Sequence, residues 1–439
     1  MASIYSTLML VAGLLLLGAI GEMIFARTRI PDVIWLVAAG IVAGPVFGIV
    51  SPDLLVPGVP YFGAIALTVI LSGGAFRLRL SEVAAAAPRG IALGLAGYLF
   101  SIIAVLVFLW LATVLGYVEE RSPFIWLMVG SIVGGTSSVV IMPTMALGNA
   151  PPAVARILEV ESAATDALSV VIAMVLLDFL ASGSADLSRP MLALATQLGI
   201  GIAAGVIAAA VFLPVIPKVR ELPHGYTLFL AVMLALYALT EAGNGNGAMA
   251  VLTASLLLGN AASIVPRLFP GARPEEFIAS QTTAVMQDQM SFLIKSFFFF
   301  LIGLMFPTNP RLIIMGAVAV AFLFIFRIPA VMLVLRGRGF APKERRLVDV
   351  SIPRGLAAGV LATLPLQYGI AGMENLAPAL FALIVFSILA FAIGYYIVNR
   401  MEEPGVARAN GVHARSNQGR GTDSYRDDPN EPTPGEPRR

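Results

Sequence analysis

Long apolar runs alternate along the chain with short clusters of proline, glycine and charged residues. Cutting at these clusters leaves about thirteen apolar segments, each long enough to cross roughly 30 Å of hydrocarbon as a helix. The segments are residues 3–26, 32–50, 60–76, 88–116, 123–147, 154–180, 190–216, 225–241, 247–266, 284–306, 311–335, 346–367 and 376–399. The pattern predicts an all-α polytopic membrane protein, with a membrane domain over residues 1–400.

The basic residues predict the orientation of these segments. With the N-terminus outside, the inner loops hold fifteen Lys and Arg residues, and the outer loops hold only Arg121, Arg189 and Arg311. Such a bias is typical of a cell (inner) membrane protein with its basic loops in the cytoplasm. The first apolar run has no basic region before it and continues to about Phe25, so it is interpreted as a span rather than a signal peptide. Residues 401–439, rich in Gly, Pro and charge, are expected to form a disordered cytoplasmic tail.

Composition excludes several classes of function. The chain is 58% hydrophobic and 12% charged, and a soluble chain would carry about twice that charged fraction. It has no cysteine, and His224 and His413 fall in a loop and in the tail. Thiol chemistry and histidine-activated serine chemistry inside the membrane are therefore excluded, and no cofactor is expected. No basic patch with interleaved aromatics points to nucleic acid. An intramembrane protease would need a second catalytic aspartate at the same depth as Asp166, and the sequence has none there. We therefore do not expect an enzyme.

Two of the segments are interrupted near their centres. Residues 134–138 read GGTSS in segment 123–147, and residues 353–355 read PRG in segment 346–367. The two segments cross in opposite directions. A matched pair of interrupted spans indicates a midplane binding site in a secondary transporter, because unwound backbone is tolerated only where it lines a cavity. The alternative is that these glycines and prolines serve helix packing alone.

Segment 154–180 carries two carboxylates, Glu161 and Asp166, inside its apolar run. An ionisable group at that depth costs roughly 2.5–3.5 kcal/mol on insertion scales, so it marks an ion or proton path by default. The alternative is a structural carboxylate paired with a buried Arg or Lys. Counting about 1.5 Å per residue puts both Asp166 and Thr136 near the midplane.

The remaining charges within the segments have simpler interpretations. Glu161 and Arg327 lie at similar depths, where pairing is the economical arrangement. Lys295 is also expected in the middle of the membrane. Four carboxylates near segment ends are expected to reach water: Asp178 and Glu241 at outer ends, Asp288 and Asp349 at inner ends.

These motifs together resemble those of the monovalent cation/proton antiporter superfamily, in its sodium/proton exchanger branch. Glu161-x-x-x-Thr165-Asp166 is similar to the E-x-x-x-N-D motif on the sixth helix of that family. Residues 135–138 (GTSS) fall where the family has its unwound fifth helix. Arg327 falls where the family has the arginine that pairs with the glutamate. Pro353-Arg354-Gly355 resembles the R-G motif of the crossing twelfth helix.

The resemblance implies inverted six-helix repeats joined by a linker helix, here segment 190–216, with crossed discontinuous helices. It also implies a homodimer with a dimerisation part and a moving core, here about residues 60–180 and 284–367. The chain departs from the pattern in two places. Thr165 replaces the asparagine, and Lys295 resembles the lysine of electrogenic members, where it pairs with an aspartate that Thr165 does not supply.

The predicted mechanism uses one carboxylate as a shared site. Asp166 binds a cation when ionised and is neutralised by a proton, with Na⁺ held by Asp166 and Thr136. Ser162 and Thr165 are further candidate oxygen ligands. Glu161 and Arg327 are expected to form a structural ion pair, with Arg354 and Lys295 as supporting charges.

One acidic carrier predicts electroneutral exchange of Na⁺, or of Li⁺ or K⁺, for H⁺, in the service of sodium and pH homeostasis. A K⁺/H⁺ antiporter has the same architecture and remains an alternative, as does a sodium-coupled symporter of an organic anion.

Overall fold

The computed structural model describes residues 4–28, 31–50, 59–77, 80–148, 150–182, 188–220, 222, 224–268, 281–337 and 339–400. The expected tail at 401–439 lies outside the described residues. The helices are α1 (Ile4–Thr28), α2 (Asp32–Ile41), η1 (Val42–Val46), α3 (Val59–Arg77), α4 (Leu80–Val114), α5 (Pro123–Ile132), α6 (Ser138–Leu147), α7 (Pro152–Ser182), α8 (Ser188–Phe212), η4 (Leu213–Val215), α9 (Ile216–Arg220), α10 (Gly225–Ala242), α11 (Gly247–Gly259), α12 (Ala261–Leu268), α13 (Gln281–Leu304), α14 (Pro310–Leu335), α15 (Pro342–Val350), α16 (Leu356–Gln367) and α17 (Met373–Arg400).

Each expected apolar segment corresponds to one of these helices or to a pair of consecutive helices. Among the described residues, seven helices are long and apolar enough to cross a membrane, and shorter apolar helices fill the remaining segments. The two segments with GGTSS and PRG are the pairs α5/α6 and α15/α16. The all-α architecture with two interrupted spans is therefore confirmed.

Glycine and proline interrupt the two broken spans. α5 ends at Ile132, and the chain is extended at Ser137, with φ of −111° and ψ of 109°, before α6 begins at Ser138. α15 ends at Val350, and Pro353, which has no N–H and disfavours helical backbone before it, lies in the gap before α16. The two gaps touch, because the backbone nitrogen of Ser137 donates a hydrogen bond of 2.9 Å to the carbonyl oxygen of Pro353.

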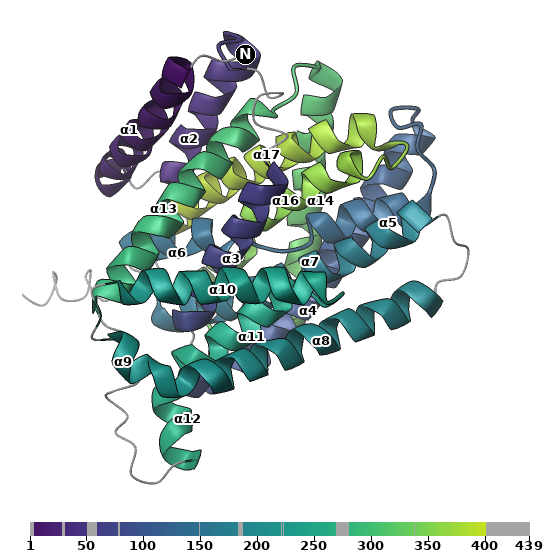
Figure 1. The fold of residues 1–439 in the computed structure, drawn as a ribbon. Helices are drawn as coiled ribbons and strands as arrows, with labels where there is room; N and C mark the ends of the chain where they lie inside the picture. The colour runs from purple at the N-terminus through teal and green to yellow at the C-terminus, as the bar shows by residue number, and fades with distance from the viewer. Residues whose placement is uncertain are drawn as a thin grey trace, which may run out of the picture.

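By their contacts the helices form two groups. Figure 1 shows α1, α2 and α13 along one side of the molecule and α8 and α10 along the lower side. The broken-helix group contains α4, α5, α6, α7, α14, α15, α16 and α17. The flanking group contains α1, α2, α3, α8, α10, α11 and α13. α7 touches α3, α8 and α11, α16 touches α3 and α13, and α17 touches α2 and α13. These contacts form the boundary between the groups.

This grouping differs from the core expected at 60–180 and 284–367. α3 packs mainly against α11, and α13 packs mainly against α2, so both belong to the flanking group. α17, beyond residue 367, packs against α14, α15 and α16 and belongs with the broken helices. The difference arises because hydropathy marks which segments span the membrane and carries no information on which spans are neighbours.

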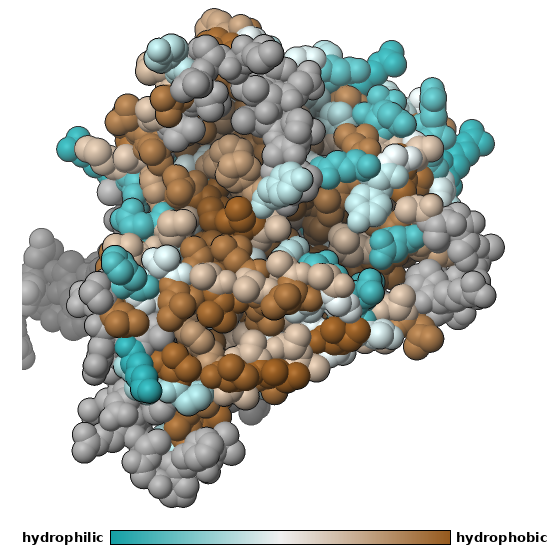
Figure 2. All heavy atoms as spheres, viewed as in Figure 1, coloured by the Kyte–Doolittle hydropathy of each residue, from teal (hydrophilic) through white to brown (hydrophobic). Residues whose placement is uncertain are grey.

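The outer surface of the helices is apolar. Figure 2 shows hydrophobic residues spread over the face formed by α8 and α10. On α8 the side chains of Ile207 and Val211 are 63% and 68% exposed. Contiguous apolar surface of this extent is typical of a protein whose surroundings are lipid.

Candidate functional site

Asp166 lies near the middle of α7 and faces a small cavity between the two helix breaks. The cavity has a volume of about 10 Å³, roughly the room that one water molecule needs. Its walls come from Ser137 at the first break, Leu356 and Ala357 after the second, and α3. Asp166 lines this cavity and is half-buried. Within the described part of the chain, no side chain donates a hydrogen bond to its carboxylate, which is therefore free to bind a cation or a proton.

Three hydroxyl-bearing residues form a buried polar cluster beside Asp166. The hydroxyls of Thr136 and Ser162 lie 3.0 Å apart, and Thr136 donates its backbone N–H to the Thr165 hydroxyl at 3.2 Å. The Thr165 hydroxyl in turn donates to the carbonyl of Ser162 at 3.2 Å. Ser162 precedes Asp166 by four residues on α7, so the two side chains share a helix face. The cluster ties the first break to α7. Of the residues in the GGTSS segment, Ser137 lines the Asp166 cavity, and the three cluster residues do not line it.

Arg354 is buried at the crossing of the two breaks, with 1% of its surface exposed. Its Nη1 donates to the carbonyls of Gly134 and Gly135 at 3.2 and 2.7 Å, and its Nη2 donates to the hydroxyl of Ser101 on α4 at 3.0 Å. The guanidinium thus satisfies carbonyl groups of the unwound segment that follows α5. Its positive charge also lies where the dipole of α5 ends in partial negative charge.

Glu161 and Arg327 form a buried bidentate ion pair between α7 and α14. Arg327 Nη1 contacts Glu161 Oε1, and Nη2 donates to Oε2 at 2.8 Å. Arg327 Nε also donates to the carbonyl of Val348 on α15 at 3.3 Å. Gly97 of α4 allows this close approach, since a Cβ there would lie 2.7 Å from Arg327 Nη1. The pair therefore joins four helices of the broken-helix group, and Glu161 does not share the cavity of Asp166.

Lys295 does not take part in this site. Its ammonium group forms an ion pair with Asp32, the first residue of α2 in the flanking group. The two helices run close together, because a Cβ on Gly40 of α2 would lie 2.9 Å from the Cα of Gly303 on α13. The partner of Lys295 is therefore on α2, and the pair fastens α13 to α2.

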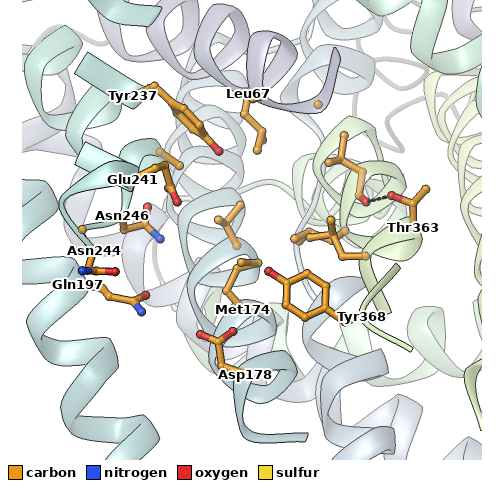
Figure 3. A pocket seen from close by; sticks show the side chains of 18 residues that line it. Leu67, Met174, Asp178, Gln197, Tyr237, Glu241, Asn244, Asn246, Thr363 and Tyr368 are labelled. Atoms are coloured by element: carbon orange, nitrogen blue, oxygen red, sulfur yellow. Dashed lines mark hydrogen bonds between the residues drawn. The ribbon is translucent and has the colours of Figure 1, made fainter. Parts of the chain in front are cut away.

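A larger cavity lies next to that of Asp166, toward the C-terminal end of α7. It has a volume of about 290 Å³, and Leu67 and Val170 line both this cavity and that of Asp166. Figure 3 shows the carboxylates of Asp178 and Glu241 beside it, from α7 and α10, with Tyr368 across from Glu241. Asp178 and Glu241 are exposed, as expected for carboxylates near the ends of spans. Of the two carboxylates expected at the other ends, Asp288 is exposed and Asp349 is half-buried.

Two residues of this arrangement were not singled out from the sequence. Ser137 lines the Asp166 cavity and joins the two breaks through its backbone. Its position in GGTSS could have marked it as a cavity-lining residue, because unwound backbone in a membrane span is tolerated only where it lines a cavity. Asp32 gave no such signal, since an acidic residue at the start of a helix is common. In the described residues, no group of three or more His, Asp or Glu side chains could hold a metal ion.

Comparisons with known proteins agree with the fold and the motifs. Residues 12–396 match the family model described as "Sodium/hydrogen exchanger, transmembrane". Na(+)/H(+) antiporter 1 of Methanocaldococcus jannaschii is 28% identical over 369 residues, which are 79% of this chain and 80% of that protein. The K(+)/H(+) antiporter NhaP2 of Shewanella oneidensis is 26% identical over 271 residues, which are 60% of this chain and 45% of that protein.

A solved structure shares the fold. The structure of the sodium proton antiporter MjNhaP1 from Methanocaldococcus jannaschii at pH 8 is 23% identical in sequence. It superposes with a TM-score of 0.72 over 89% of this chain and 99% of that chain. The paired broken helices, the unpaired Asp166 between them and the family match along nearly all of the membrane region lead to one assignment. The chain belongs to the transmembrane sodium/hydrogen exchanger family.

Proposed function

We propose that the chain exchanges Na⁺ for H⁺ across the membrane, with Asp166 as the site that the two ions occupy in turn. The observation that carries the proposal is the unpaired Asp166 carboxylate facing a cavity between both helix breaks. An ionised carboxylate there attracts a cation, and a proton abolishes that attraction, so one group suffices to couple the two flows. Alternating access at a central site between two helix groups is the usual mode of such transporters.

The oxygen atoms around Asp166 suit an alkali cation. The hydroxyls of Thr136 and Ser162 are 3.0 Å apart and can turn their lone pairs toward a cation, because a hydroxyl hydrogen rotates to suit its partner. Thr165 is already engaged as donor and acceptor, so we assign it to holding Thr136 in place. Hard cations prefer oxygen ligands of this kind. Na⁺ would thus be held by Asp166, Thr136 and Ser162, with backbone carbonyls from the breaks, and no cofactor is needed.

We propose that the exchange is electroneutral, with one cation for one proton. Asp166 is the single carboxylate lining its cavity. Lys295, the residue that could have added a second titrating charge, is paired with Asp32 away from that cavity. The complex of one carboxylate with either Na⁺ or H⁺ is neutral, so a full exchange cycle moves no net charge across the membrane.

Assembly and orientation complete the proposal. A homodimer is supported by the membership of the chain in the sodium/hydrogen exchanger family, because the resemblance to that family implied one. The cell membrane, with the N-terminus outside and the C-terminal tail in the cytoplasm, is supported by the distribution of Lys and Arg between loops.

A K⁺/H⁺ antiporter is the second candidate, because relatives with that name match 60% of the chain. The test is ion-resolved transport. Purified protein in liposomes with a trapped pH-sensitive dye is given Na⁺, Li⁺ and K⁺ separately. Proton movement driven by Na⁺ supports the proposal, and movement driven by K⁺ alone transfers it to the second candidate. Absence of proton movement with any of the three cations rejects both.

A further inference from the structure

A second cavity lies on the outside of the broken-helix group, between α4 and α14. It has a volume of about 300 Å³ and an apolar lining that includes Leu111, Leu115, Ile314 and Val318. Leu115 and Ile314 are 62% and 61% exposed, so the cavity opens as a groove on the outer surface. The α4/α14 groove shares no residue with the cavities around Asp166 and Asp178.

One end of the α4/α14 groove carries a positive charge. Arg311, in the first turn of α14, lines this end together with Tyr117. Arg311 is exposed, and the described residues offer its guanidinium no carboxylate partner. Glu120 in the loop nearby accepts a hydrogen bond of 2.6 Å from the backbone of Ser122, and neither it nor the exposed Glu119 lines the groove. An arginine beside a tyrosine is typical of the level where lipid headgroups meet the apolar layer.

The other end of the groove is lined by aromatic rings. Phe108 of α4 and Phe322 of α14 line it, with ring centroids 5.6 Å apart. Arg311 and Phe322 are eleven residues apart on one helix, or about 16 Å at 1.5 Å per residue. That length matches one leaflet, about half of the roughly 30 Å hydrocarbon layer. The groove therefore has a headgroup end and an acyl-chain end at the right separation.

We propose that the α4/α14 groove binds one phospholipid with an anionic headgroup. The phosphate lies against the guanidinium of Arg311, and one acyl chain runs along Leu115, Ile314 and Val318 toward the two phenylalanine rings. Arg311 supplies the charge complementarity, and a guanidinium matches phosphate geometry with two donors. Because both walls belong to the broken-helix group, the bound lipid travels with that group when it moves against the flanking group.

The proposal is tested by native mass spectrometry and thermal unfolding of the delipidated full-length protein. Each preparation is titrated with phosphatidylglycerol, with phosphatidylcholine of the same acyl chains, and with glycerol phosphate. The variants are Arg311→Gln, which removes the charge, and Ile314→Trp, which fills the groove from an exposed position. The matched controls are Arg121→Gln, a cation outside the groove, and Leu333→Trp, an exposed leucine at the far end of α14.

We expect phosphatidylglycerol to bind the wild type more tightly than phosphatidylcholine and to raise its unfolding temperature. Arg311→Gln should weaken this binding about fivefold, the effect of one arginine at an anionic lipid surface. Ile314→Trp should weaken it at least as much, and the two controls should leave it unchanged. Equal binding by variants and controls would overturn the proposal, leaving only non-specific surrounding lipid. Glycerol phosphate that binds as tightly as phosphatidylglycerol, with an affinity that Ile314→Trp does not change, would also overturn the proposal. The groove end would then be a site for free phosphate.

Discussion

Ser137 and Pro353, which are more than two hundred residues apart in the sequence, are joined by a backbone hydrogen bond of 2.9 Å. This bond holds the two helix breaks in contact beside Asp166. Gly355 is part of the same contact, because a Cβ at that position would collide with the hydroxyl of Ser137. The crossing of the broken helices is therefore a close-packed joint rather than a loose gap.

A methyl group at Gly355 should disturb this joint. We expect Gly355→Ala to destabilise the protein by about 1–3 kcal/mol through overpacking and to slow transport. Gly199→Ala on α8 is the control, because a Cβ there has no neighbour within 4 Å. The control should be neutral or slightly stabilising, since alanine favours helix. Thermal unfolding in detergent compares the two, and equal unfolding temperatures would contradict the close-packed joint.

Removing the guanidinium of Arg354 should leave the carbonyls of Gly134 and Gly135 unsatisfied inside the protein. Each such group costs roughly 1–3 kcal/mol, so Arg354→Ala should strongly reduce stability. Arg354→Lys keeps the charge but lacks the planar fork that reaches both carbonyls and Ser101, so we expect it to restore only part of the loss.

The control for Arg354 is Arg336→Lys, at an exposed position after α14. It should unfold as the wild type does. If Arg354→Lys also unfolds like the wild type, the bonds to the carbonyls contribute little, and the supporting role assigned to Arg354 is wrong.

The ion pair of Glu161 and Arg327 should behave as structural support. Removing one partner leaves a buried charge unpaired, and we expect Glu161→Gln or Arg327→Met to cost about 3–5 kcal/mol. The double variant should lose much less than the sum of the two, because neither charge is left alone. A double-mutant cycle from unfolding curves measures this coupling. Strict additivity would show that the two side chains do not interact.

The pair of Lys295 and Asp32 should be dispensable for the coupling of ions. We expect Lys295→Met/Asp32→Asn, which removes both charges, to retain cation-driven proton movement at wild-type stoichiometry. Lys295→Met alone leaves Asp32 buried and unpaired and should mainly lower the unfolding temperature. Transport is measured in liposomes with and without an imposed membrane potential. Loss of transport in the well-folded double variant would show that the Lys295–Asp32 pair is required for ion transport.

Much of the site could be predicted because its residues break local rules. A carboxylate in an apolar run marks Asp166, and glycines and a proline in mid-span mark both breaks. Glu161 and Arg327 could be paired from their depths, since a buried charge of either sign needs a partner. The partner of Lys295 could not be predicted in this way. Depth along one helix does not identify the neighbouring helix, and Asp32 at the start of α2 resembles an ordinary first-turn acid.

The division into helix groups was harder to predict from the sequence, because hydropathy does not identify which helices are neighbours. α3, α13 and α17 are all apolar helices, and their contacts separate the first two from the third. The apolar character of a span reports the lipid around it, whereas its place in the bundle depends on side-chain packing and on close glycine contacts such as that of Gly40 with Gly303.

Substituting Asp166 tests the central claim most directly. Asp166→Asn keeps the size of the side chain and removes its charge, and Asp178→Asn on the same helix is the matched control at the wider cavity. The measurement is Na⁺-driven proton movement in liposomes, with unfolding temperatures confirming that both variants are folded. We expect Asp166→Asn to abolish the movement and Asp178→Asn to retain it. Proton movement at the wild-type rate in folded Asp166→Asn would contradict the role of Asp166 as the shared site.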